Sequence, residues 1–218
     1  MELPKIESLA KVVQRSLAKS NGLANYSEAS LSTDFILPPT CLTTTKEENI
    51  VLFDGATDQG SRMIMFSTKR NLQVLEEYPN WIADGTFYVC PKIFQQSYSL
   101  HAVIDGKCIP LVFALLSDKT EKTYVFFLNI IKIAVCNITD GIIMVDFEKA
   151  AMNAFRSVFE QFNLMNCFFH LCQSVQKRIS KSFRKLYRTD KAFTRASRLV
   201  AFLALMRCWR IPRAIGSS

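Results

Sequence analysis

The sequence predicts a mixed α/β domain with one sheet and helices on its faces. Three apolar, aromatic-rich segments follow one another at residues 81–90, 95–105 and 108–117, which is typical of an antiparallel meander. Helical and strand-like patterns then alternate along the chain. A meander followed by such an alternation builds a mixed sheet in the order β-β-β-α-β-α-β-α. Hydrophobic residues form 49% of the 218 residues, so the chain can fill a core and is not disordered throughout.

The chain ahead of the meander divides into two parts. Residues 1–47 combine an N-terminal helix, in which apolar residues recur every three or four positions, with a Ser- and Thr-rich linker that contains Pro38-Pro39. Residues 48–80 predict a small β-hairpin with strands at 49–53 and 62–67, followed by a helix at 71–78. We therefore expect a domain boundary near residue 48.

The elements after residue 80 carry the fold. Asp105-Gly106 is a strong hairpin signal between the second and third strands of the meander. Asp118 and Glu121 stand at capping positions for a helix at 119–136. A buried strand is expected at 141–146, a second helix at 148–162, and a fifth strand at 164–170 before a third helix.

The positive charge lies at the C-terminal end. The chain has a formal net charge of +8, but residues 171–218 hold twelve Lys and Arg against the single acid Asp190. This asymmetry indicates contact with nucleic acid, although an ordinary solvated helix face explains it as well. A long amphipathic helix is expected here, and its polar side would bind nucleic acid through six basic residues: Lys177, Arg178, Lys181, Arg184, Lys185 and Arg188. The rest of the chain offers no membrane anchor, so a membrane partner is not expected.

Two aspartates are expected to meet in the sheet. The first strand at 81–90 and the strand at 141–146 can lie side by side, which brings Asp84 close to Asp146. Converging carboxylates repel one another unless they share a proton or hold divalent cations such as Mg²⁺ or Mn²⁺. The alternative is structural, with Asp84 a hydrogen-bonded strand residue and Asp146 a helix cap.

Four successive segments resemble a known family. WIADGTF, PLVFALLSDKTEKTYVFFL, IIMVDFEKAAMNAF and CFFHLCQSVQK follow the order of motifs in the MULE (Mutator-like element) transposase domain. The resemblance implies a five-stranded ribonuclease H-like sheet over residues 81–188 and a basic helix over 189–218 that begins a helical insertion. It also implies a DDE-type transposase that cleaves and transfers DNA strands in the nucleus. Asp84 and Asp146 would be its first two catalytic residues and would hold Mg²⁺ or Mn²⁺. DNA, as transposon ends and target, would be its partner, and assembly of identical chains fits this role.

The third carboxylate of the family is not found. After Glu160 the only acid is Asp190, which comes too early and is expected to cap a helix at 191–210. We therefore expect the active site to be incomplete or degenerate in this chain. The alternative function is a non-catalytic DNA-binding or regulatory protein derived from a transposase.

Cys167 and His170 match the Cys-x-x-His motif of the family. A structural zinc ion usually has four protein ligands, and the only other histidine, His101, lies on a distant segment. We therefore expect a packed thiol and a hydrogen-bonded imidazole rather than a zinc site. The seven cysteines are scattered and odd in number, which favours reduced thiols inside the cell.

Overall fold

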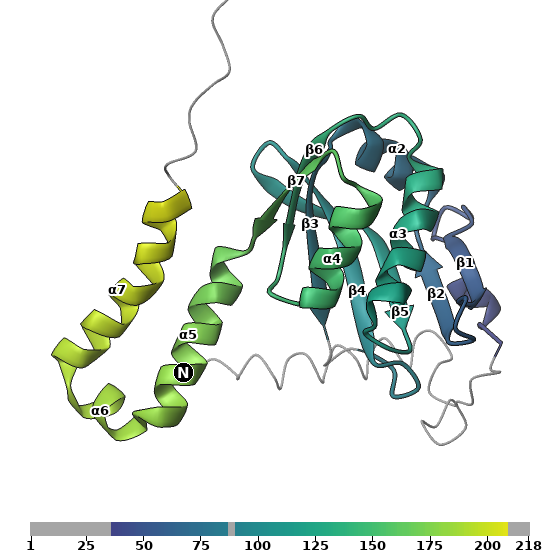
Figure 1. Cartoon of the computed structure of the whole chain (residues 1–218). Coiled ribbons are helices and arrows are strands. Elements are labelled where there is room, and N and C mark those ends of the chain that lie inside the picture. The colour runs from purple at the N-terminus through teal and green to yellow at the C-terminus, as the bar shows by residue number, and fades with distance from the viewer. Residues whose placement is uncertain (1–35, 87–89, 209–218) are drawn as a thin grey trace, which may run out of the picture.

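One mixed seven-stranded sheet forms the body of the molecule (Figure 1). The computed structural model describes residues 36–86 and 90–208. The strand order is β1-β2-β5-β4-β3-β6-β7, so the prediction of a mixed α/β domain is confirmed. The strands are β1 (Val51–Ala56), β2 (Arg62–Phe66), β3 (Asn80–Thr86), β4 (Gln96–Ile104), β5 (Lys107–Leu116), β6 (Gly141–Val145) and β7 (Phe162–Asn166).

The sheet has seven strands rather than the predicted five because the hairpin β1–β2 joins it. β2 pairs antiparallel with β5, from Met63 opposite Leu116 to Phe66 opposite Phe113. This pairing satisfies the edge of β5, which would otherwise expose unpaired N–H and C=O groups. Met63 and Met65 also contribute to the buried core. The division of the chain into domains near residues 48 and 81 stays a prediction.

The meander is confirmed, and so is the expectation that its first strand lies beside the strand at 141–146. β3, β4 and β5 pair antiparallel in sequence order, and Asp105 and Gly106 form the turn between β4 and β5 with φ angles of 49° and 74°. β3 then pairs parallel with β6, and β6 pairs parallel with β7. The C-terminal ends of three neighbouring strands therefore lie at one edge of the sheet.

Two helices cover one face of the sheet, α3 (Glu121–Ala134) and α4 (Lys149–Val158) (Figure 1). The predicted apolar face of the first helix is buried, including Tyr124, Phe127 and Ile131. α3 begins at Glu121, because the side chain of Thr120 accepts a hydrogen bond from the amide of Thr123. Residues that alternate along β4 from Gln96 pack beneath the helices, as a period of two requires.

An aromatic cluster near the starts of β3 and β7 connects the sheet to helix α2 (Lys69–Glu77). The ring of Trp81 lies 5.3 Å from that of Phe159 and 5.0 Å from that of Phe162. The indole Nε1 donates a hydrogen bond of 3.0 Å to the carbonyl oxygen of Leu75 in α2. Trp81 therefore buries a large apolar surface while its single polar group is satisfied.

The boundary between β7 and the next helix differs from the prediction. The strand ends at Asn166 instead of residue 170, and α5 (Phe168–Ser182) begins two residues later. Phe162 and Leu164 pack against the core, so the strand register is set before Cys167. Apart from Asn166 itself, the apolar sequence around this boundary contains no turn residue to mark the change.

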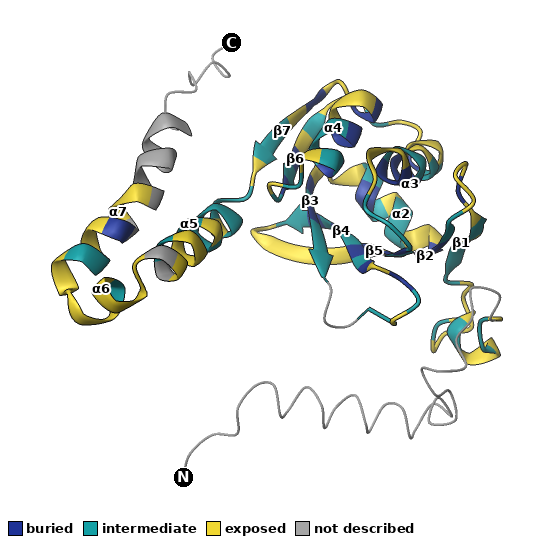
Figure 2. Ribbon diagram, turned by 60° about the horizontal axis from the view of Figure 1, so that its bottom comes forward, coloured by how far each residue is buried: buried dark blue, intermediate teal, exposed yellow. Residues whose placement is uncertain are grey.

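Three helices then form an arm, α5 with α6 (Arg184–Thr189) and α7 (Lys191–Cys208). Figures 1 and 2 show α5 leading away from β7, α6 at the far end and α7 returning beside α5. The single long helix expected over this basic stretch is wrong, because the chain leaves the helical conformation at Phe183 (φ −131°, ψ 36°). The capping prediction for Asp190 is confirmed, since its Oδ1 accepts hydrogen bonds from the amides of Ala192 (2.8 Å) and Phe193 (3.0 Å).

Some predictions fall outside the described residues. These are the N-terminal helix at 1–19, the first part of the linker, and the chain from residue 209 onward, including the end of the helix expected at 191–210. Among the described helices, none combines the length and the apolar character needed to cross a bilayer.

Candidate functional site

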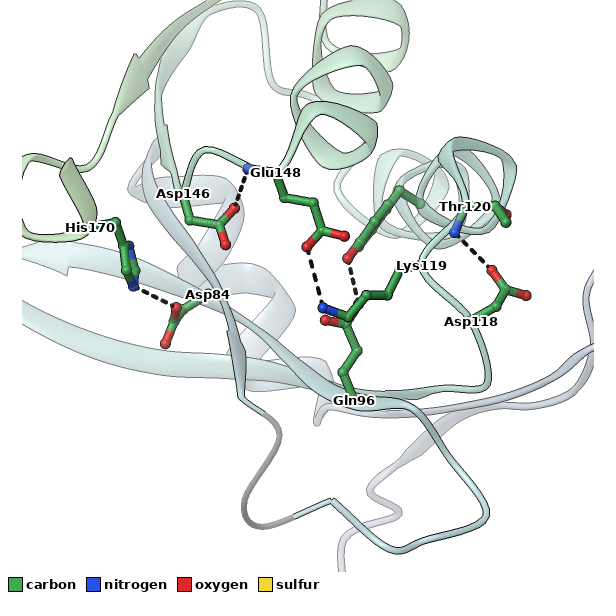
Figure 3. A network of polar contacts seen from close by, with 9 residues as sticks. Asp84, Gln96, Asp118, Lys119, Thr120, Asp146, Glu148 and His170 are labelled. Carbon is green, nitrogen blue, oxygen red and sulfur yellow. Dashed lines mark hydrogen bonds and ion pairs between the residues drawn. The ribbon is translucent and has the colours of Figure 1, made fainter. Parts of the chain in front are cut away.

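Asp84 and Asp146 emerge from neighbouring parallel strands on the same face of the sheet. Ile82 lies opposite Met144 in the register of β3 and β6. Two residues further along each strand direction stand Asp84, still in β3, and Asp146, directly after β6. Because side chains alternate with a period of two, both carboxylates project from the face opposite α3 and α4. Figure 3 shows them at the adjoining ends of the two strands.

The carboxylate of Asp146 is oriented by the start of α4. Its Oδ1 accepts a hydrogen bond of 3.1 Å from the backbone amide of Glu148, the residue that caps the helix. This is a local turn of the kind that aspartate side chains form with the backbone two residues on. Asp146 therefore has a structural role next to the start of α4, although the N-cap residue is Glu148 and not Asp146, and its carboxylate is half-exposed beside β3.

The carboxylate of Asp84 contacts a histidine from the arm. Nε2 of His170 lies 3.6 Å from Oδ1 of Asp84, and their side chains are 31% and 41% exposed. This contact exists because α5 starts at Phe168, which places His170 in the first helical turn instead of at the end of a strand. The sequence did not predict this contact, because the Cys-x-x-His spacing relates His170 only to Cys167.

Cys167 itself serves a structural purpose. It is the N-cap residue of α5, and its amide donates a hydrogen bond of 2.7 Å to the carbonyl oxygen of Val145. The described residues contain no group of three or more His, Cys, Asp or Glu side chains placed to hold a metal ion. The roles of Cys167 and His170 as ligands, and the expectation about zinc, stay predictions.

A polar row on β4 supports the first aspartate. Ser99 lies opposite Asp84 in the β3–β4 register, and its hydroxyl donates to the carbonyl oxygen of Asp84 (3.3 Å). The hydroxyl of Ser99 also lies 2.8 Å from Nε2 of His101. Burial lowers the pKa of His101, and the negative charge of Asp84 opposes that shift. Ser97, Ser99 and His101 alternate with apolar residues, and this period of two is the sequence pattern that could have predicted a row of polar side chains on one face of β4.

A second polar cluster lies between the starts of α3 and α4. Oε2 of Glu148 lies 3.9 Å from Nζ of Lys119, and the amide of Gln96 donates to the hydroxyl of Tyr124 (Figure 3). Burial raises the pKa of Tyr124 well above its ordinary value; the hydrogen bond from Gln96 opposes this rise, and the charge of Glu148 adds to it. Burial likewise raises the pKa of Tyr98, and the charges of the nearby acids Asp146, Glu148 and Asp84 add to this rise. Both phenols therefore stay neutral and act as hydrogen-bonding groups.

The glycine after Asp84 is required by this cluster. A Cβ atom at Gly85 would lie 2.8 Å from Oε1 of Gln96, whose side chain is fully buried. Among the described residues, that oxygen and the hydroxyl of Tyr98 have no hydrogen-bond partner. Gly85 thus lets the Gln96 side chain pass beneath the strand that carries Asp84.

The six basic residues predicted to bind nucleic acid all lie on the arm. Lys177, Arg178 and Lys181 belong to α5, whereas Arg184, Lys185 and Arg188 belong to α6. All six are exposed. Their placement on two helices follows from the break at Phe183.

The mixed sheet, with two carboxylates at adjoining strand ends, places this protein in the class of α/β domains with an acidic site. Within the chain, residues 81–174 match the family model of the MULE transposase domain. The resemblance found in the sequence is thereby confirmed, and the match spans Asp84, Asp146, Cys167 and His170. A transposase domain suggests a transposase-like function and implies DNA as the partner. No curated protein matches the chain.

Proposed function

We propose that this chain is a transposase-like protein of the Mutator-like family, in which Asp84 and Asp146 belong to a divalent-metal site for DNA strand cleavage and transfer that is incomplete or degenerate because the third carboxylate is not found. The observation that carries the proposal is the placement of Asp84 and Asp146 at adjoining ends of β3 and β6, on one face. The match over residues 81–174 supports it independently. The nucleus, where chromosomal DNA is available, is its proposed place of action.

The proposed arrangement is ribonuclease H-like. Without the hairpin β1–β2, the remaining strands run in the order β5-β4-β3-β6-β7. A three-stranded antiparallel meander is thus extended by two parallel strands beside its first member. This order supports the arrangement because it places the acidic residue of β3 at the centre of the five strands, beside the end of β6.

The two aspartates fit a magnesium or manganese site. Mg²⁺ prefers oxygen ligands, and proteins often bind it through one or two carboxylates, with waters and substrate phosphates as the other ligands. Asp84 and Asp146 offer half-exposed carboxylates that a substrate phosphate can approach. When bound, such ions activate the attacking oxygen and stabilise the leaving oxygen in phosphodiester cleavage.

The protein's own residues would orient this site. The amide of Glu148 fixes one oxygen of Asp146, and the hydroxyl of Ser99 holds the backbone of β3 at Asp84. His170 lies beside Asp84, where it can hold the carboxylate in position. The exposed cations of the arm would bind the DNA backbone without reading its sequence.

Manganese-dependent nicking of terminal-repeat DNA tests the proposal. If the two aspartates are enough for the wild-type chain to nick this DNA, Asp84→Asn and Asp146→Asn should each abolish nicking while DNA binding persists, because each removes a carboxylate ligand. Asp140→Asn is the matched control, since Asp140 is exposed and lies at the opposite end of β6. Nicking that survives in both site variants would refute the assigned roles.

The second candidate is a non-catalytic DNA-binding or regulatory protein. The contact between His170 and Asp84 favours it, because the imidazole Nε2, 3.6 Å from Oδ1 of Asp84, can hold this carboxylate in place without any metal ion. In that case, the wild-type chain would bind DNA with the same affinity with and without Mn²⁺ and would not nick it.

A further inference from the structure

The far end of the arm contains a basic pocket between α6 and α7. It has a volume of about 410 Å³ and is lined by Arg188, Lys191, Thr194 and Arg195. Arg188 lies in the last turn of α6, and the other three residues belong to the first turns of α7. Figures 1 and 2 both show this end of the arm far from the sheet. We call it the arm-tip pocket.

The chemistry of the arm-tip pocket is that of an anion site. Three of its four lining side chains are cationic, and none of them has an ion-pair partner within the described part of the chain. Asp190 is the only acid after Glu160, and its Oδ1 already accepts the amides of Ala192 and Phe193. The positive charge of the pocket is therefore left for a ligand.

A hydrogen bond between α6 and α7 stabilises the shape of the pocket. The hydroxyl of Thr194 donates to the carbonyl oxygen of Tyr187 at the end of α6 (2.7 Å). Because this hydrogen bond joins the two helices, it fixes Arg188 relative to Arg195. Guanidinium groups match phosphate oxygens in a bidentate geometry, which favours a phosphate ligand over a simple halide.

We propose that the arm-tip pocket binds a backbone phosphate of DNA outside the segment held at Asp84 and Asp146. This inference rests on the proposed function, because it takes DNA as the partner. α5 rises about 1.5 Å per residue, so its course from His170 to Ser182 spans about 18 Å. At about 3.4 Å per base pair, this length corresponds to about five base pairs of a duplex lying along α5.

The test is the salt dependence of binding to a 30-base-pair duplex, measured by fluorescence anisotropy with the full chain. Replacing Arg188, Lys191 and Arg195 together by Gln should weaken binding about 100-fold at about 0.1 M salt. The slope of log K against log salt should become shallower by about two to three, because up to three phosphate contacts are lost. An unchanged slope would overturn the proposal.

Two further variants control for charge and folding. Gln at Lys69, Arg70 and Lys122 removes the same charge from exposed positions on α2 and α3, and it should leave the slope nearly unchanged. The charge-preserving variant Arg188→Lys, Lys191→Arg and Arg195→Lys should keep a slope close to that of the wild type. If the control on α2 and α3 acts like the arm-tip variant, the effect is one of overall charge and the proposal fails.

Single neutral methylphosphonate linkages in the duplex locate the contact. The wild-type chain should lose affinity at one linkage to which the arm-tip variant is insensitive. If inorganic phosphate protects the wild-type chain against unfolding while the substitutions leave duplex affinity unchanged, the ligand is free phosphate and the assignment to DNA is wrong. If the wild-type chain nicks DNA with Mn²⁺ but the arm-tip substitutions leave the salt slope unchanged, only the proposal for the arm-tip pocket is refuted. If the wild-type chain does not bind the duplex at all, both proposals are refuted.

Discussion

Asp118 shows how one carboxylate can stabilise a helix start without being its cap. Its Oδ1 accepts hydrogen bonds from the amide of Thr120 (2.9 Å) and from the hydroxyl of Thr123. Partial burial acts to raise the pKa of Asp118, but the hydrogen bonds from Thr123 and Thr120 together outweigh it, so the pKa is lowered. The charged form is therefore the one that the fold stabilises.

Asp118→Asn should lower the free energy of unfolding at neutral pH, because a neutral amide oxygen accepts these hydrogen bonds more weakly. The folded pKa lies below the unfolded value of about 3.9, so the stabilisation is complete above that value and disappears as the pH falls through the folded pKa. Urea unfolding should thus show a difference between the two proteins at about pH 6 that shrinks towards about pH 3. A pH-independent difference would contradict this account, and the exposed Asp140→Asn provides the baseline.

The placement of Asp84 and Asp146 at adjoining strand ends could be predicted at the residue scale, whereas the contact of His170 could not. Each aspartate follows an apolar strand pattern, and the rules of strand order place the two strands side by side. The helix that carries His170 begins inside the segment from Leu164 to Phe169, which is apolar apart from Asn166 and fits a strand equally well. A shift of a few residues in this boundary changes which side chain reaches Asp84.

At the scale of elements, the start of β6 is the most tightly constrained point of the sheet. The amide of Ile142 donates a hydrogen bond of 3.0 Å to the carbonyl oxygen of Pro79, just before β3. A Cβ atom at Gly141 would overlap both that oxygen and the ring of Phe162. A glycine is needed here because two backbones and an aromatic ring approach one another closely.

Gly141→Ala should therefore destabilise the protein by about 1–3 kcal/mol or more, because the added methyl group overpacks a rigid site. The measurement is urea unfolding monitored by circular dichroism. Ile133→Ala is a suitable control, since Ile133 on α3 is 79% exposed and its truncation should change stability little. Equal stabilities of wild type and Gly141→Ala would show that β3 and β6 can separate without cost.

The existence of most elements could be predicted, but two of their relations could not. Periodicity identified the strands and the helices α3 and α4, since each buries one face. Periodicity did not indicate that β2 would pair with β5. A hairpin that buries two methionines could equally well form a separate unit. The break at Phe183 lacks a glycine or proline, so the apolar stripe from Leu171 to Leu186 continues through it.

At the scale of the whole molecule, the sheet and the arm differ in how they are held together. The sheet encloses a core of fully buried aromatic and aliphatic side chains. In the arm, Ser197 is the only buried residue among those whose burial is described. The arm should therefore open locally at a lower free energy than the sheet.

Brief digestion with trypsin should consequently cut the arm first. Among the described residues, we expect cleavage within 177–195 before any cleavage within 51–166, because proteases act on segments that open locally. Mass spectrometry of the early fragments is the measurement. A 30-base-pair duplex should slow these cuts if the arm binds DNA, and early cuts inside the sheet would contradict the difference in stability.

The parallel pairing of β3 with β6 also determines when an acidic site can exist during synthesis. The hairpins β3–β4 and β4–β5 join segments that are close in sequence, so they can form while the rest of the chain is still on the ribosome. β6 follows only after α3 has been made, about sixty residues after Asp84. An unfinished chain therefore carries Asp84 without Asp146, and we expect nascent copies to be inert towards DNA until the second half of the sheet has docked.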